Sequence, residues 1–172
     1  MQELAVQPGG TVGETVVSVG MQFLGTPYVA STLESKGEEK LVVNFLGLDC
    51  TTFVENVLAI SLMKIEGHRD WDAFLQNLEQ IRYRDGKLQG YPSRLHYFSD
   101  WIRDNQDKGL VKDITPEIGG VSGQKEINFM GTHSELYPAL GQGDHLEEIR
   151  SIEASLSSET LCILPSEAVS GQ

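Results

Sequence analysis

The chain has 172 residues, of which 40% are hydrophobic and 22% are charged. A chain of this length can bury a core without disulfides or metals, so it is predicted to fold as a soluble globular protein. Its 25 acidic residues against 13 lysines and arginines give a net charge of -12, which leaves no basic surface for a nucleic acid. No apolar run approaches the roughly 20 residues that span a bilayer, so no membrane span is expected.

The two cysteines, Cys50 and Cys162, lie far apart in the sequence. They form no CxxC motif of the kind that binds metals or carries redox chemistry, and one bridge between them stays possible. The chain begins with polar sequence instead of the basic and apolar regions of a secretory signal, so we expect no signal peptide in it. An exported protein whose signal has been removed would begin in the same way.

The segment from residue 11 to residue 26, TVGETVVSVGMQFLGT, is predicted to form the first helix. Thr11 and Glu14 have the spacing of a capping box, in which side chains satisfy the free backbone groups at a helix start. Apolar residues then recur at helical period. Gly25 and Pro27 break this pattern, which leaves Tyr28 on a loop.

A second and more apolar helix is predicted from Thr51 to Gly67, with Asp49 as a suitable N-cap just before it. Its apolar residues fill a wide face, which suits a helix buried centrally and not one lying on a surface. The apolar residues from 41 to 46 could form a strand or an extended loop.

Two further helices are expected in the middle of the chain. The first follows Asp70 as its N-cap and ends before Gly86, and the second follows Ser93 as its cap and closes at Gly109. Each has apolar residues along one face. The segment after them, residues 110–115 with the sequence LVKDIT, is predicted to form a strand.

The last part of the chain begins with a glycine-rich stretch, residues 116–131, that has little periodicity. A helix is predicted over residues 143–158, with Asp144 at the cap and Glu147 three positions later. The apolar segment LCIL, residues 161–164, is predicted to form a strand but has few strands to pair with. Either a sheet lies elsewhere in the chain, or the rest of the sheet is missing.

Cys50 has the strongest case for chemistry. Most lone cysteines beside an apolar helix are buried structural residues, and this interpretation suits Cys162. Cys50, however, lies at the predicted start of a helix, where free N–H groups and the positive end of the helix dipole stabilise a thiolate. The same N–H groups can receive the oxyanion that forms during acyl transfer. Cys50 is therefore either a nucleophile or a packed structural residue.

Three segments resemble one protein family: LDCTTFVENVLA around Cys50, LGTPYVASTLE before it and SRLHYFSDWIRDN after it. They look like the N-acetylmuramoyl-L-alanine amidase-like proteins of domain of unknown function 1460, which are similar to the NlpC/P60 group of papain-like cysteine peptidases. The resemblance runs from about Gly25 to the C-terminus. It implies an α+β fold of the papain-like NlpC/P60 type, mainly helical in this portion, with a small and incomplete antiparallel sheet.

The resemblance also implies roles for individual residues. Cys50 falls on the nucleophile of the family, at the start of the central helix. Asp49 matches an acid that can meet the free amine of the peptide's first residue, and Tyr28 matches a tyrosine that can donate to the oxyanion. The implied reaction is hydrolysis of amide bonds in bacterial peptidoglycan peptides through an acyl-enzyme. Such a substrate implies a protein of the cell envelope or periplasm, or a secreted one.

In the NlpC/P60 group the catalytic base is a histidine on a strand that reads roughly His-Val-Gly, and this chain contains no such segment. Residues 1–172 are therefore expected to form a single domain that lacks the C-terminal sheet of the family. His96 is the best candidate base among the histidines present, because it lies in the family-like segment SRLHYFSDW. A substrate-binding or structural role of His96 competes with this one.

Arg94 and Tyr97 flank His96 and are candidate substrate-binding residues. A guanidinium binds carboxylates in a bidentate manner, and peptidoglycan peptides carry several carboxylates. No cofactor is expected, and no metal site is predicted either. The remaining histidines and their acidic neighbours do not have the spacing of metal ligands.

Two other interpretations stay open. The chain could be a glycan-binding or glycan-cleaving, xylanase-like protein in which Cys50 is only packed and aromatic rings face the sugar. Those aromatic residues are Trp71, Tyr91, Tyr97 and Trp101, although their helical spacing is also typical of a core. The chain could instead be an inactive fragment. Its sequence leaves open which amide bond is cleaved and what the oligomeric state is.

Overall fold

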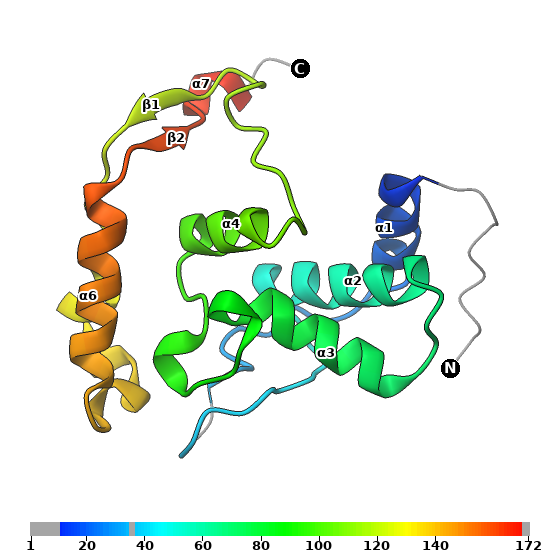
Figure 1. The fold of residues 1–172 in the computed structure, drawn as a ribbon, viewed down its shortest axis with the longest axis horizontal. Helices are drawn as coiled ribbons and strands as arrows, with labels where there is room; N and C mark the ends of the chain where they lie inside the picture. The colour runs from blue at the N-terminus through cyan, green and yellow to red at the C-terminus, as the bar shows by residue number, and fades with distance from the viewer. Residues whose placement is uncertain (1–10, 35–36, 170–172) are drawn as a thin grey trace. The chain divides into compact units, whose positions relative to one another are not determined.

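The computed structural model describes residues 11–34 and 37–169 (Figure 1). The chain divides into two compact units, one up to Leu88 and one from Gln89 onward. In these described residues the first unit is helical, and the second combines helices with a two-stranded antiparallel sheet. The fold is therefore α+β and mostly helical, as predicted. None of the helices in this part of the chain combines the length and the apolar character that crossing a bilayer requires.

The described part of the first unit is built from α1 (Val12–Met21), α2 (Cys50–Ile65) and α3 (Trp71–Arg82), with the short helix η1 (Arg84–Gly86) after them. Helix α2 packs against both α1 and α3 (Figure 1), which is the central position that its wide apolar face predicted. The predicted capping box of α1 is confirmed, because the side chains of Thr11 and Glu14 each accept from the backbone N–H of the other. Residues 41–46 form a loop that bends at Phe45 and Leu46, and not a strand.

The core of the first unit is formed by one face of each helix. Its buried apolar side chains include Val19 from α1, Val57 and Ala59 from α2, and Phe74, Leu78 and Ile81 from α3. The α3 residues have the spacing of a single helical face, so the periodicity of the sequence identified them correctly. Burial of this face stabilises α3 more than the helix propensity of its residues does.

A buried ion pair joins α2 to α3. Arg82 Nε lies 2.8 Å from Glu55 Oε2, and both side chains are only 2% exposed. The Arg82 guanidinium also donates to the carbonyl of Val42. This one cation therefore ties two helices to the loop that leads towards α2. A buried charge is tolerated only when it is paired, because the desolvation of an ion costs several kcal/mol.

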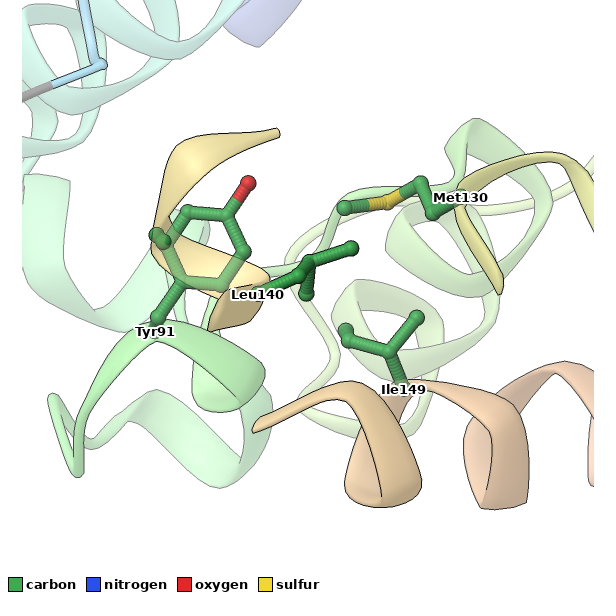
Figure 2. Packing of buried hydrophobic residues seen from close by; sticks show 5 residues of the cluster. Tyr91, Met130, Leu140 and Ile149 are labelled. Atoms are coloured by element: carbon green, nitrogen blue, oxygen red, sulfur yellow. The ribbon is translucent and has the colours of Figure 1, made fainter. Parts of the chain in front are cut away.

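The second unit contains η2 (Tyr91–Ser93), α4 (Phe98–Asp107) and the long helix α6 (His145–Ser158). Shorter helices complete it, namely α5 (Phe129–Thr132), η3 (Ser134–Leu136), η4 (Pro138–Gly141) and α7 (Ser166–Val169). Its core gathers side chains from η2, α5, η4 and α6, as Figure 2 shows for Tyr91, Met130, Leu140 and Ile149. Short helical segments that could not be stable alone are thus held by packing against α6.

The strands β1 (Val121–Gly123) and β2 (Leu161–Ile163) pair in antiparallel orientation, with Ser122 opposite Cys162. Strand β2 is the short apolar strand that the sequence predicted, and its partner comes from the glycine-rich stretch. A Cβ at Gly120 would lie 2.5 Å from the Sγ of Cys162. Glycine at this position therefore permits the close approach of the two segments.

One prediction about the second unit is wrong, and two are right only in part. The helix expected after Ser93 begins at Phe98, because Ser93 ends η2 and its hydroxyl donates to the carbonyl of Gly90. The strand expected at residues 110–115 is an irregular loop, in which the backbone N–H groups of Leu110 and Val111 both donate to the carbonyl of Asn105 in α4. Asp144 lies at the N-cap of α6 as predicted, but its side chain makes no capping hydrogen bond.

We expect the substitution Glu55→Gln to lower the free energy of unfolding by about 3 kcal/mol, because it leaves the Arg82 charge buried without its counter-ion. Urea denaturation followed by circular dichroism measures this change. Glu117→Gln is the matched control, since Glu117 pairs with Lys112 on the surface and such pairs contribute about 0–1 kcal/mol. If the free energy of unfolding falls equally in Glu55→Gln and Glu117→Gln, the buried pair stabilises the fold no more than a surface pair does.

Candidate active site

Cys50 is the first residue of α2, and its side chain is exposed. Asp49 is the N-cap, as predicted, and its Oδ1 accepts from the backbone N–H and from the hydroxyl of Thr52, both at 2.8 Å. In return, the Oγ1 of Thr52 accepts from the N–H of Asp49 at 2.9 Å. This reciprocal capping box determines where the chain leaves the loop and enters the helix, and so where Cys50 lies.

Thr52 is the partner that sequence reasoning missed. Its side chain is 2% exposed, so it belongs to the packed base of the site and not to its open face. The spacing Asp49-x-x-Thr52 is a signal that could have found it, since a capping box joins the N-cap to the third helical residue.

Tyr28 is held beside the segment that leads into α2. It forms an isolated parallel bridge with Leu48. The N–H of Val29 donates to the carbonyl of Leu48 at 3.0 Å, and the N–H of Leu48 donates to the carbonyl of Pro27 at 3.1 Å. The Tyr28 side chain is 73% exposed, so its ring is not part of the core. The structure therefore places the backbone of Tyr28 beside Leu48, two positions before Cys50 in the chain.

The other predicted site residues, Arg94, His96 and Tyr97, belong to the second unit. Arg94 and His96 both contact Tyr91. Arg94 is 5% exposed, and its guanidinium carbon lies 4.8 Å from the centre of the Tyr91 ring. Nε2 of His96 lies 2.9 Å from the carbonyl oxygen of Tyr91, and the ring centroids are 4.5 Å apart. Nε2 thus donates to a carbonyl, so a role as base would require Nδ1. This geometry favours a structural role for His96, and its catalytic role stays a prediction.

The hydroxyl of Tyr97 lies in a network that joins α5 and α6 to the residue before α4. It donates to Oε1 of Glu153 at 2.5 Å and accepts from the N–H of Met130 at 2.9 Å. The N–H of Gly131 donates to the same carboxylate oxygen at 2.8 Å. Burial raises the pKa of Tyr97, and the hydrogen bond to Glu153 raises it further. Tyr97 therefore joins α5 and α6 structurally, and its substrate-binding role stays a prediction.

A groove of about 740 Å³ lies within the second unit, and Cys162 is among its lining residues. Its walls include the half-exposed rings of Phe98 and Phe129. Of the aromatic residues considered for a sugar site, Tyr91 and Trp101 are instead buried in the core. In the described residues, histidine, cysteine and acidic side chains form no group of three or more that could hold a metal ion.

We expect Asp49→Ala to lower the free energy of unfolding by about 1 kcal/mol, because it removes the cap of α2. Asp49→Asn should preserve most of the stability, since the oxygen of its side-chain amide can accept the same bonds from Thr52. Chemical denaturation of both variants measures the difference. If the free energy of unfolding falls as much in Asp49→Asn as in Asp49→Ala, the charge of Asp49 stabilises the helix and its capping geometry does not.

The contribution of Tyr97 to stability should be present below about pH 10, the pKa of a tyrosine in an unfolded chain, and should diminish above it. Because burial raises the pKa of Tyr97 in the folded state, only the unfolded state loses this proton as the pH first rises. Urea unfolding at several pH values between about 8 and 11 should show a steeper fall for the wild type than for Tyr97→Phe. If the free energy of unfolding falls equally with pH in the wild type and in Tyr97→Phe, the raised pKa of Tyr97 is contradicted.

Comparison with known proteins relates the chain to one group. A family profile described as N-acetylmuramoyl-L-alanine amidase-like, or AmiA-like, matches residues 18–172. Among solved structures, the chain is similar to an N-acetylmuramoyl-L-alanine amidase from Bacteroides uniformis. The two share 40% sequence identity and a TM-score of 0.85, over 92% of this chain and 67% of that chain. A comparison with curated proteins finds no match.

Two further structures extend this relationship. A proposed xylanase from Bacteroides fragilis shares 40% identity and a TM-score of 0.80, over 87% of this chain and 66% of that chain. A Legionella pneumophila protein of domain of unknown function 1460 shares the fold alone, with 23% identity and a TM-score of 0.61 over 88% of this chain and 55% of that one. The chain thus spans about two thirds of the length of the two Bacteroides proteins. Both the profile match and the identity show that the chain belongs to the AmiA-like family of N-acetylmuramoyl-L-alanine amidase-like proteins.

Proposed function

We propose that this chain acts as a cysteine-dependent hydrolase of amide bonds in peptidoglycan peptides, with Cys50 as the nucleophile. The observation that carries the proposal is an exposed thiol at the first residue of a 16-residue helix, next to a capped and well-defined turn. Membership of an amidase-like family supports the cell wall as the substrate. That substrate in turn suggests action in the cell envelope or outside the cell.

The proposed reaction begins with a thiolate at Cys50, which the free N–H groups at the start of α2 stabilise. The thiolate attacks the carbonyl carbon of the amide, and the carbonyl oxygen becomes an oxyanion. Backbone N–H groups and the hydroxyl of Tyr28 donate to this oxyanion. The oxyanion then re-forms the carbonyl as the C–N bond breaks, and the amine leaves with the proton that Cys50 gave up. Water hydrolyses the thioester to a carboxylic acid and the free thiol.

A histidine that accepts the proton of Cys50 would complete a papain-like mechanism of the NlpC/P60 type. The resemblance of its segment to the family supports His96 for this role, through Nδ1, because Nε2 is bound to the carbonyl of Tyr91. The same resemblance supports Arg94 and Tyr97 as ligands of the peptide. Oδ1 of Asp49 is engaged by Thr52. Its other oxygen, Oδ2, is therefore the one proposed to meet the amine of the substrate. Asp49→Asn removes this charge while keeping the cap, so it should raise KM for peptides with a free amine.

Cys50→Ser should reduce kcat for the hydrolysis of soluble peptidoglycan fragments by about 1,000-fold or more, because an unactivated hydroxyl is a far weaker nucleophile. Liquid chromatography with mass spectrometry measures the products and also identifies the bond that is cut. Cys162→Ser is the matched control, since Cys162 is half-buried on β2 and has no proposed part in the reaction. Undiminished hydrolysis by Cys50→Ser would exclude Cys50 as the nucleophile.

Alkylation tests the same proposal without any substrate. Cys50 should react with iodoacetamide faster than Cys162 at neutral pH, because it is exposed and lies at a helix start. Peptide mapping separates the two sites within one sample. If Cys50 reacts no faster than Cys162, its thiol is not activated in this chain.

A glycan-cleaving function is the second candidate, and two observations favour it. The chain is 40% identical to the proposed xylanase from Bacteroides fragilis. The groove in the second unit also presents Phe98 and Phe129, and exposed aromatic rings provide apolar surface with a defined geometry. In that case Cys50→Ser should leave the release of reducing sugar from xylan or from glycan strands unchanged. The same variant therefore separates the two functions.

A further inference from the structure

Gly47 lies where the segment of Tyr28 approaches the segment that leads to Cys50. A Cβ built on Gly47 would lie 2.7 Å from Cγ2 of Val29 and 3.0 Å from its Cβ. Carbon atoms in contact normally stay about 3.5–4.0 Å apart. Rotation of the Val29 side chain would move Cγ2 but not Cβ, whose position is set by the backbone. Any side chain at residue 47 must therefore push one of the two backbones away.

Hydrogen bonds of Asn44 and Asn56 fix the loop that contains Gly47. Oδ1 of Asn44 accepts from the N–H of Leu46 at 2.9 Å and from the N–H of Gly47 at 3.3 Å. Asn56, which is buried on α2, donates from Nδ2 to the carbonyl of Asn44 at 3.5 Å and to that of Thr52 at 2.8 Å. The bonds to Asn44 thus fix the loop internally, and the contact from Asn56 to the Asn44 carbonyl joins the loop to α2. A clash at Gly47 therefore displaces Val29 more readily than it displaces the loop.

Displacement of Val29 would move Tyr28 with it. The bridge bonds to Leu48 come from Pro27 and Val29, on both sides of Tyr28. A donor to an oxyanion acts at about 2.7–3.1 Å from the oxygen, so a small shift of the segment weakens its contribution strongly.

We propose that Gly47 is a positioning residue for Tyr28: the absence of a side chain at residue 47 lets the segment 27–29 pair with Leu48, and this pairing holds the Tyr28 hydroxyl within reach of the oxyanion. The inference rests on the proposed function, in which Cys50 is the nucleophile and Tyr28 is an oxyanion donor. Gly47 itself touches neither the substrate nor the reacting atoms.

Gly47→Ala should lower kcat for peptidoglycan fragments by about 10- to 100-fold, the range expected when one oxyanion donor is misplaced. KM and the alkylation rate of Cys50 should change little, because the nucleophile and its helix are untouched. Gly13→Ala is the matched control, since a Cβ at Gly13 would meet no atom within 4 Å. In a Tyr28→Phe background Gly47→Ala should have little further effect, because the donor is already absent. Full kcat in Gly47→Ala would overturn the proposal.

A graded rescue separates positioning from general damage to the fold. Val29→Ala combined with Gly47→Ala removes the contact at 2.7 Å but keeps the one at 3.0 Å, so it should restore kcat in part. Val29→Gly removes both contacts and should restore most of it. Loss of kcat that neither change at Val29 relieves would show that the clash is not the cause.

Hydrogen exchange tests Gly47 independently of activity. The amides of Val29 and Leu48 form the bridge bonds, so both should exchange faster in Gly47→Ala and return towards the wild-type rates when Val29→Gly is added. Unchanged exchange in Gly47→Ala would overturn the inference. If Cys50→Ser retains activity while exchange responds as expected, the proposed function fails, but the packing of Gly47 against the segment of Tyr28 stands.

Discussion

The capping box between Asp49 and Thr52 is the interaction on which the candidate site depends. It satisfies free backbone groups at the start of α2 and thereby determines which residue is the first of the helix. Because that residue is Cys50, the thiol lies where N–H groups and the helix dipole favour negative charge. Thr52 is buried and its carbonyl accepts from the side chain of Asn56, so a side-chain hydrogen bond also joins the first turn of α2 to the next one.

The loop before α2 connects this site to the core. Near its start, the carbonyl of Val42 accepts from Arg82, whose charge is paired with Glu55 in the interior. Near its end, Leu48 pairs with the segment of Tyr28. The loop has no regular secondary structure along most of its length, yet side chains of α2 and α3 hold it at several points. Its geometry therefore follows from the packing of the helices and not from its own backbone preferences.

The second unit uses polar residues of its family-like segment for packing. His96 and Arg94 surround Tyr91, and Tyr97 joins the carboxylate of Glu153 to the start of α5. A buried carboxylate that accepts from a hydroxyl and a backbone N–H specifies one arrangement of these elements, since leaving it unsatisfied would be costly. Residues that a motif marks as chemical can thus also be structural. Only substitutions that separate stability from kcat and KM distinguish the two roles.

The sequence by itself determined the helices of the first unit, the caps at Thr11, Asp49 and Asp70, and the position of Cys50 at a helix start. These features depend on residues within a few positions of one another, so local periodicity and capping patterns are sufficient to reveal them. Tertiary structure alone decided the bridge of Tyr28 to Leu48, the pairing of β2 with a glycine-rich strand and the partnership of Tyr97 with Glu153. Each of these depends on contacts between residues that are distant in the chain or on backbone groups bound by a neighbouring element, and no local pattern encodes such a choice.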